Sequence, residues 1–158
     1  MSANPSPNSN ETPTELNRAN TAVKSRAASV QLPTDQELVL KVIPMPRDCN
    51  ANGDIFGGWV MAQVDLAGAV VPARYVKGRI VTVAVNEFVF KHPVRVGDIL
   101  SFFAQLTRIG RTSVTVKVEV FAEQFGSENE YTKVTEASIT YVAIDEQGQP
   151  REVPQKLI

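Results

Sequence analysis

The chain has 158 residues, enough for one domain with a substantial hydrophobic core. Its formal net charge of −1 favours neither nucleic acid nor an acidic membrane surface, so we expect neither as a partner. One cysteine and one histidine exclude an internal disulfide and a Cys- or His-rich metal site within one chain. The sequence shows no membrane-spanning run and no apolar core of a secretory signal, so we expect a soluble cytoplasmic protein.

The first 36 residues are rich in Asn, Ser, Thr and Pro and contain few large apolar side chains. Such a composition buries too little apolar surface to offset the conformational entropy lost on ordering. We therefore expect a disordered tail over residues 1–36, a folded domain over 37–153 and a short tail over 154–158. A targeting peptide is the alternative for the first segment, but Glu11 and Glu15 argue against it.

The folded part begins with an apolar run over residues 37–43, which predicts a strand ended by prolines. A turn-rich loop follows, and then a long apolar segment opens with Gly57 and Gly58. Because this segment is apolar on nearly every side, it predicts a helix buried in the core. Pro72 is expected to end or bend that helix.

Four further strands with short connections are predicted after the helix. Residues 79–90 are mostly β-branched and aromatic, which predicts a central strand. Residues 99–109, 114–120 and 131–144 predict the others, the second of these by strict alternation of valine with polar residues. Short connections imply antiparallel neighbours. The sequence therefore predicts a two-layer α+β domain, with one long helix packed on a five-stranded antiparallel sheet.

Asp65 is the one residue between Ile55 and Ala73 that can carry a full charge. An acidic side chain rarely stays buried among apolar neighbours without a partner. Asp65 is therefore either satisfied by a backbone or hydroxyl donor, or it belongs to a functional site in which its carboxylate acts as a base.

Gly57 and Gly58 stand at the start of the predicted helix, where the first backbone N–H groups have no partner within the helix. Those donors suit a developing oxyanion, although the two glycines could also simply fit a tight turn. Asp65 follows eight residues after Gly57, about 12 Å along a helix. One carbonyl carbon cannot touch both groups. A site that uses both must therefore come from two chains, with antiparallel helices across a dimer axis.

Three blocks of the sequence carry a family resemblance. They are NANGDIFGGWVMAQVDLAGA, GRIVTVAV and F-x-x-PVRVGD, in this order. With these blocks the chain closely resembles the YciA-type acyl-CoA thioesterases of the hotdog fold, over about residues 37–153. The resemblance implies hydrolysis of acyl-CoA to a free acid and coenzyme A, with no metal or other cofactor. It also implies a homo-oligomer, a hexamer built as a trimer of dimers.

The resemblance assigns roles to particular residues. Asp65 would activate water or attack the thioester carbonyl itself, and the backbone N–H of Gly57 from the partner subunit would bind the oxyanion. Asn50 would orient water or substrate, with Asn52 as a second candidate. The turn over residues 110–113 is similar to one that contacts the coenzyme A phosphates in related enzymes. The full set expected to bind substrate is Asn52, Gly58, Val83, Val85, Gly110, Arg111, Thr112 and Ser113.

Two of these expectations also rest on the residues themselves. Coenzyme A carries several phosphate charges, so basic groups are expected near the site, and Arg111 is favoured because Gly110 leaves its backbone accessible. The strand that contains Val83 and Val85 can offer main-chain groups to the pantetheine arm.

Two other functions remain open for a hotdog protein. A hydratase or dehydratase usually needs a His paired with a carboxylate, but His92 is predicted in a turn far from Asp65. A non-catalytic acyl-CoA sensor generally carries a DNA-binding domain, but no helix-turn-helix or basic stretch is recognisable here. Thioester hydrolysis is therefore the function that the sequence favours.

Overall fold

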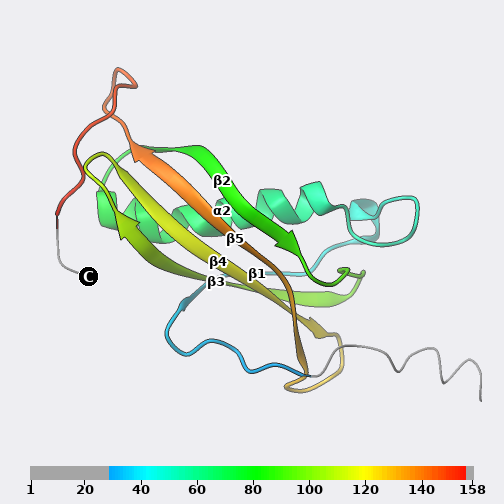
Figure 1. Cartoon of the computed structure of the whole chain (residues 1–158). Helices are drawn as coiled ribbons and strands as arrows, with labels where there is room; N and C mark the ends of the chain where they lie inside the picture. Colours follow the sequence, from blue (N-terminus) through cyan, green and yellow to red (C-terminus); the bar gives the residue numbers. More distant parts are fainter. Residues whose placement is uncertain (1–28, 156–158) are drawn as a thin grey trace, which may run out of the picture.

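Of the 158 residues, the computed structural model describes residues 29–155 as one long helix packed on one antiparallel sheet (Figure 1). The strands are β1 (Glu37–Val42), β2 (Ile80–Phe90), β3 (Asp98–Ile109), β4 (Ser113–Gln124) and β5 (Tyr131–Ala143), and the helices are the short 3-10 turn η1 (Pro46–Asp48) and α2 (Gly57–Val76). The five strands lie in the order β1-β3-β4-β5-β2. This arrangement confirms the predicted two-layer α+β domain.

Helix α2 buries one face against the sheet and leaves the other face open. The buried residues recur at helical spacing and are Val60, Val64, Ala67, Gly68, Pro72 and Val76. On the opposite face, Met61 is 43% exposed and Leu66 is 62% exposed. The prediction of a helix buried on nearly every side is therefore wrong for the single chain, because composition does not say which apolar side chains the same chain covers.

The sequence predicts that Pro72 ends or bends the helix. Pro72 instead lies inside α2 and does not end it, so the first of these alternatives is wrong. A proline removes one backbone hydrogen bond from a helix. Here Pro72 is on the buried face, so packing against the sheet offsets that loss. The helix continues to Val76 and stops at Lys77, which has a left-handed backbone conformation with φ of 50°.

Strand β2 is an edge strand, not the central strand that its composition predicts. It pairs with β5 on one side only, and its valines at 81, 83 and 85 are between 40% and 54% exposed. β-branched residues are favoured wherever a strand surface is packed against other atoms. Their presence therefore does not show whether those atoms belong to the same chain or to another one. Strand β4 runs four residues beyond the predicted alternation, because a register shift after Val120 interrupts the pattern without ending the pairing.

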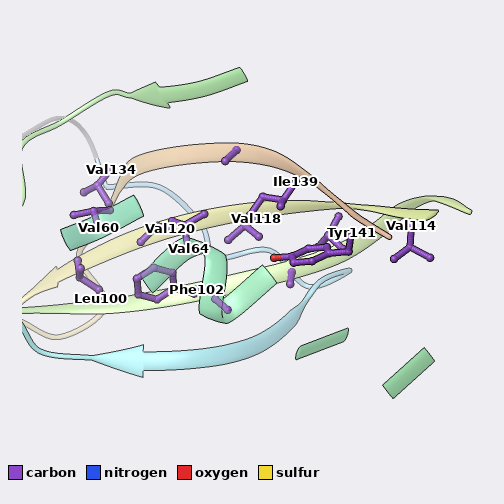
Figure 2. Close-up of a cluster of buried hydrophobic side chains, with 14 of the residues drawn as sticks. Val60, Val64, Leu100, Phe102, Val114, Val118, Val120, Val134, Ile139 and Tyr141 are labelled. Atoms are coloured by element: carbon purple, nitrogen blue, oxygen red, sulfur yellow. The ribbon is translucent and has the colours of Figure 1, made fainter. Parts of the chain in front are cut away.

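The hydrophobic core lies between α2 and the facing side chains of β3, β4 and β5 (Figure 2). Val118, Ile139 and Tyr141 are fully buried there. Gly68 allows close approach of the helix, because a Cβ atom at this position would lie 2.5 Å from Tyr141 Oη and 3.0 Å from Ile139 Cδ1. Among the residues described, no helix has the length and apolar character needed to cross a membrane.

The variant Gly68→Ala is expected to lower the free energy of unfolding by about 1–3 kcal/mol, because the added methyl group overpacks the contact with Tyr141. Gly58→Ala is the matched control on the same helix, since a Cβ atom at Gly58 would meet nothing within 4 Å. That change is expected to be neutral or stabilising by up to about 1 kcal/mol. Denaturant unfolding of both variants tests the pair, and equal effects would contradict it.

The sheet face away from α2 carries a cluster of paired charges. Lys133 hydrogen-bonds to both Glu119 and Glu136, and Lys91 lies 2.7 Å from Glu136. These lysines hold the pKa of the Glu136 carboxyl at about 2, well below its ordinary value. Gln36 donates to Glu119 from the segment that precedes β1. The cluster therefore fixes that segment on the sheet.

Parts of both predicted tails pack on the domain. The backbone N–H of Val30 donates to the Tyr131 carbonyl at 2.9 Å, so residues 29–36 extend the fold beyond the boundary predicted at residue 37. At the other end, Tyr75 Oη donates to the Pro154 carbonyl at 2.7 Å, so the first residue of the predicted C-terminal tail also packs on the domain. The remainder of the predicted tails, residues 1–28 and 156–158, lies outside the described residues.

Candidate active site

Asp65 lies at the middle of α2, half-buried beside strands β2 and β5. Thr82 Oγ1 donates to Asp65 Oδ1 at 2.8 Å. Tyr141 Oη donates to the backbone carbonyl of Asp65 at 2.9 Å and lies 3.4 Å from the same Oδ1. One carboxylate oxygen is therefore held by hydroxyl groups of the sheet.

The other oxygen of Asp65, Oδ2, has no hydrogen-bond partner within residues 29–155. No Lys, Arg or His of the same residues lies within 4.0 Å of the carboxylate. The expected hydroxyl donor is thus present, but it satisfies only half of the group. A half-buried carboxylate with one anchored and one unpaired oxygen can serve as a base or as a nucleophile.

Thr82 and Tyr141 are the two neighbours of Asp65 that sequence reasoning missed. Thr82 is the one polar residue within the block IVTVAV, and the pairing register places it directly opposite Tyr141. A polar residue within an apolar strand is a feature that sequence analysis could have detected. The contact of Thr82 with a helix residue 17 positions earlier could not be predicted, because it depends on how the helix is rotated on the sheet.

Helix α2 begins with two unpaired donors. Phe56 is the N-cap and gives no side-chain cap, while its carbonyl accepts from the N–H groups of Trp59 and Val60. The N–H groups of Gly57 and Gly58 have no backbone or side-chain acceptor in the described part of the chain. These two donors, at the positive end of the helix dipole, can bind an anion or a developing oxyanion.

A tight turn does not require both glycines. Neither Gly57 nor Gly58 has a positive φ angle. A Cβ atom at Gly57 would lie 3.1 Å from the ring of Phe90, whereas a Cβ atom at Gly58 would meet nothing within 4 Å of the same chain. The open space at Gly58 is therefore available to a ligand or to another subunit.

Asn50 shapes the loop that leads into α2. Its side-chain Oδ1 accepts from the backbone N–H groups of Asn52 and Asp54, at 2.8 and 3.2 Å. The loop joins the helix start through the N–H of Phe56, which donates to the Asp48 carbonyl. The structure thus places Asn50 in the loop that precedes Gly57. Its amide nitrogen has no hydrogen-bond acceptor within residues 29–155, and Asn52 is exposed on the loop.

Strand β2 connects the two parts of the site. Thr82 contacts Asp65 near the start of the strand, whereas Phe90 contacts Gly57 at its end. Val83 sits at an irregularity of the pairing, and Val85 lies opposite Ile139, so both remain at the exposed edge next to Thr82.

The turn over residues 110–113 is held by the C-terminal segment. The N–H of Gly110 donates to the Ser113 carbonyl at 2.8 Å, and Thr112 accepts from the N–H of Ala143. The carbonyl of Arg111 accepts from the N–H of Val153, while its guanidinium is largely exposed and lies 3.6 Å from Glu152.

Within one chain the predicted site residues form two groups. The turn at 110–113 and Asp65 lie toward the end of the sheet where β2 starts, since Ser113 and Val81 both pair with Val142. Gly57 lies beside Phe90, the last residue of β2, at the other end of that strand and about 12 Å along α2 from Asp65. The structure brings Asp65 and the turn to one half of the molecule, and Gly57 and Asn50 to the other.

Exposed apolar side chains flank both groups on α2 and β2, which lie side by side in Figure 1. They are Phe56, Met61, Leu66, Val81, Val83, Val85, Val89 and Phe90. An exposed apolar surface of this extent marks an interaction site. Among residues 29–155, no group of three or more His, Cys, Asp or Glu side chains is arranged to hold a metal ion.

The fold and this pattern of groups define the class of hotdog thioesterases, and comparison with known proteins agrees. The model of the thioesterase superfamily matches residues 52–127. The acyl-CoA thioester hydrolase YciA of Escherichia coli is 45% identical over 120 residues, which are 75% of this chain and 91% of that protein. The chain belongs to the YciA-type acyl-CoA thioester hydrolases of this superfamily.

Solved structures show the same fold. The hexameric thioesterase y2039 of Yersinia pestis is 43% identical with a TM-score of 0.73, and the match covers 79% of this chain and all of that one. An acyl-CoA hydrolase of Staphylococcus aureus, solved with butyryl coenzyme A and coenzyme A, is 28% identical with a TM-score of 0.69, over 73% and 70% of the two chains. These likenesses confirm the hotdog fold predicted from the sequence.

Proposed function

We propose that this protein hydrolyses acyl-CoA thioesters to a free carboxylic acid and coenzyme A, at sites shared by two subunits. The observation that carries this proposal concerns one helix: Oδ2 of Asp65 and the N–H groups of Gly57 and Gly58 all lack a partner among the described residues 29–155. About 12 Å of helix separates these complementary groups. Each therefore needs its counterpart from another copy of the chain.

In the proposed reaction, Asp65 removes a proton from water while the water oxygen attacks the thioester carbonyl carbon. The negative charge that develops on the carbonyl oxygen is stabilised by the N–H of Gly57, aided by Gly58. The C–S bond then breaks, and the thiolate of coenzyme A takes up the proton. Direct attack by Asp65 Oδ2, followed by hydrolysis of the anhydride, needs the same groups. A thioester is already activated, so neither route needs a metal or redox cofactor.

A second copy of the chain is the proposed cover for the exposed apolar side chains of α2 and β2. Two helices that run antiparallel across a twofold axis would place Gly57 and Asn50 of one subunit beside Asp65 of the other. The amide nitrogen of Asn50 would then reach the water or the substrate. The hexameric state of the Yersinia pestis relative supports a trimer of such dimers as the full assembly.

The rest of the substrate would follow β2 and the turn at 110–113. The exposed edge at Val83 and Val85 offers main-chain groups to the pantetheine arm, next to Thr82 and Asp65. The exposed guanidinium of Arg111 would bind phosphate of the nucleotide part. The complex of the Staphylococcus aureus relative with butyryl coenzyme A supports this class of substrate.

The experiment that tests the function is incubation with a panel of acyl-CoA thioesters and a thiol reagent. Thiol release with the rate proportional to enzyme confirms hydrolysis, and the panel gives the preferred chain length. Tight binding without release would identify an acyl-CoA sensor. Conversion of an enoyl-CoA without thiol release would identify a hydratase.

Arg111→Ala is expected to raise KM for acyl-CoA by about 3- to 10-fold and to leave kcat near its original value, because one charge-assisted phosphate contact is lost. The matched control is an acyl-pantetheine thioester, which carries the same acyl group and no phosphate. Its KM is expected to be equal for the two proteins. An equal rise in KM with both substrates would remove the phosphate role from Arg111.

A further inference from the structure

The hydroxyl of Tyr141 is buried beneath helix α2 and points at Asp65. Tyr141 is 1% exposed and lies among the core side chains of β4 and β5 (Figure 2). Its Oη donates to the Asp65 carbonyl at 2.9 Å and lies 3.4 Å from Oδ1 of the same residue. Tyr141 thus contacts the backbone and the side chain of the one acid on the helix.

Gly68 provides the space for this hydroxyl. It lies three residues after Asp65 on the buried face of α2, and a Cβ atom there would lie 2.5 Å from Tyr141 Oη. Any other residue would force the hydroxyl or the helix to move. The glycine and the tyrosine therefore form one contact that sets the position of the helix turn that carries Asp65.

The same tyrosine stays protonated. Burial raises the pKa of the Tyr141 hydroxyl above its ordinary value, and the negative charge of Asp65 raises it further. The group is consequently a neutral hydrogen-bond donor throughout the pH range in which thioester hydrolysis is measured.

We propose that Tyr141 is a positioning residue for the reaction: seated against Gly68, its hydroxyl acts with Thr82 to hold Oδ1 of Asp65, which leaves Oδ2 to face the thioester. Thr82 approaches from β2 at 2.8 Å and Tyr141 from β5, so two strands fix the carboxylate. This inference rests on the proposed function of Asp65. Tyr141 does not touch the substrate in this arrangement and acts only through the acid.

The variant Tyr141→Phe removes the hydroxyl and keeps the ring. We expect kcat to fall by about 3- to 10-fold, because a misplaced base is less effective in the chemical step, with KM for acyl-CoA within about twofold. Tyr75→Phe is the matched control. Its hydroxyl also joins α2 to a backbone carbonyl, that of Pro154 at 2.7 Å, but it lies ten residues beyond Asp65, about 15 Å along the helix. This variant is expected to keep its kcat.

The two variants are compared well below their melting temperatures. Tyr141→Phe with kcat within twofold of the original protein, or an equal loss of kcat in Tyr75→Phe, overturns the inference. If Tyr141→Phe does not fold, Gly68→Ala decides, since its methyl group displaces the same hydroxyl. A fall in the kcat of Gly68→Ala with constant KM supports the positioning role of Tyr141. An unchanged kcat overturns that role. An active Asp65→Asn variant, by contrast, would overturn the catalytic role of Asp65, on which this inference rests.

Discussion

Replacement of Asp65 by Asn is expected to lower kcat for acyl-CoA hydrolysis by about 10²- to 10⁴-fold, the usual contribution of a positioned general base. The asparagine side chain has the same shape, and its amide oxygen can still accept from Thr82 Oγ1, which lies 2.8 Å from Oδ1 in the native protein. What is lost is the unpaired, negatively charged Oδ2. The expected result is therefore a folded protein that binds substrate and does not turn it over.

Thiol release under single-turnover conditions measures this loss, and the melting temperature checks the fold. Asp35→Asn is a suitable control, because it makes the same chemical change at an exposed residue that precedes β1. It is expected to retain full activity. Turnover of Asp65→Asn close to that of the control would show that Asp65 is a structural acid, satisfied by its hydroxyl neighbours.

The sequence predicted the layers of the fold, and it singled out Asp65, the residue at the centre of the proposed site. Periodicity and turn residues located every strand and the helix to within a few residues. Asp65 was identified because a charge in an apolar segment has few structural explanations. Both predictions rest on local features of the chain, where composition and spacing determine the outcome.

The remaining features depend on neighbours distant in sequence. Composition placed β2 at the centre, but in the single chain it is an edge strand with exposed valines. Leu66 belongs to the segment that composition predicts to be buried, but in the single chain it is exposed on the open face of α2. A second subunit that covers these residues would explain their apolar character. An apolar sequence pattern shows that a residue is covered, but it does not show whether the same chain or another chain covers it.

The hydrogen bonds of Asp65 also depend on residues distant in sequence, so the sequence does not predict them. Thr82 and Tyr141 reach the carboxylate because β2 and β5 pair in one particular register, and because Gly68 lets the helix approach. None of these three residues carries a motif by itself. Their shared role follows only from the rotation and depth of α2 on the sheet.

The shared site predicts that two inactive variants restore activity when mixed. Gly57→Pro removes the proposed oxyanion donor at the first helical position, where proline is well tolerated. The preceding residue, Phe56, has φ of −54° and ψ of 129°, which lies outside the helical region that a following proline disfavours. We expect its kcat to fall by about 10²- to 10³-fold. Gly57→Ala is the matched control, because it adds the same Cβ contact with Phe90 and keeps the N–H.

Mixed dimers of Asp65→Asn and Gly57→Pro then contain one doubly altered site and one site with both native groups. Random assembly during co-expression or refolding makes about half of the dimers mixed, so about a quarter of all sites regain activity. If instead one subunit supplied both groups, every site would carry one lesion and the mixture would stay inactive. Because Gly57 and Asp65 are fixed on one rigid helix about 12 Å apart, the recovered quarter would show that catalysis depends on the second chain.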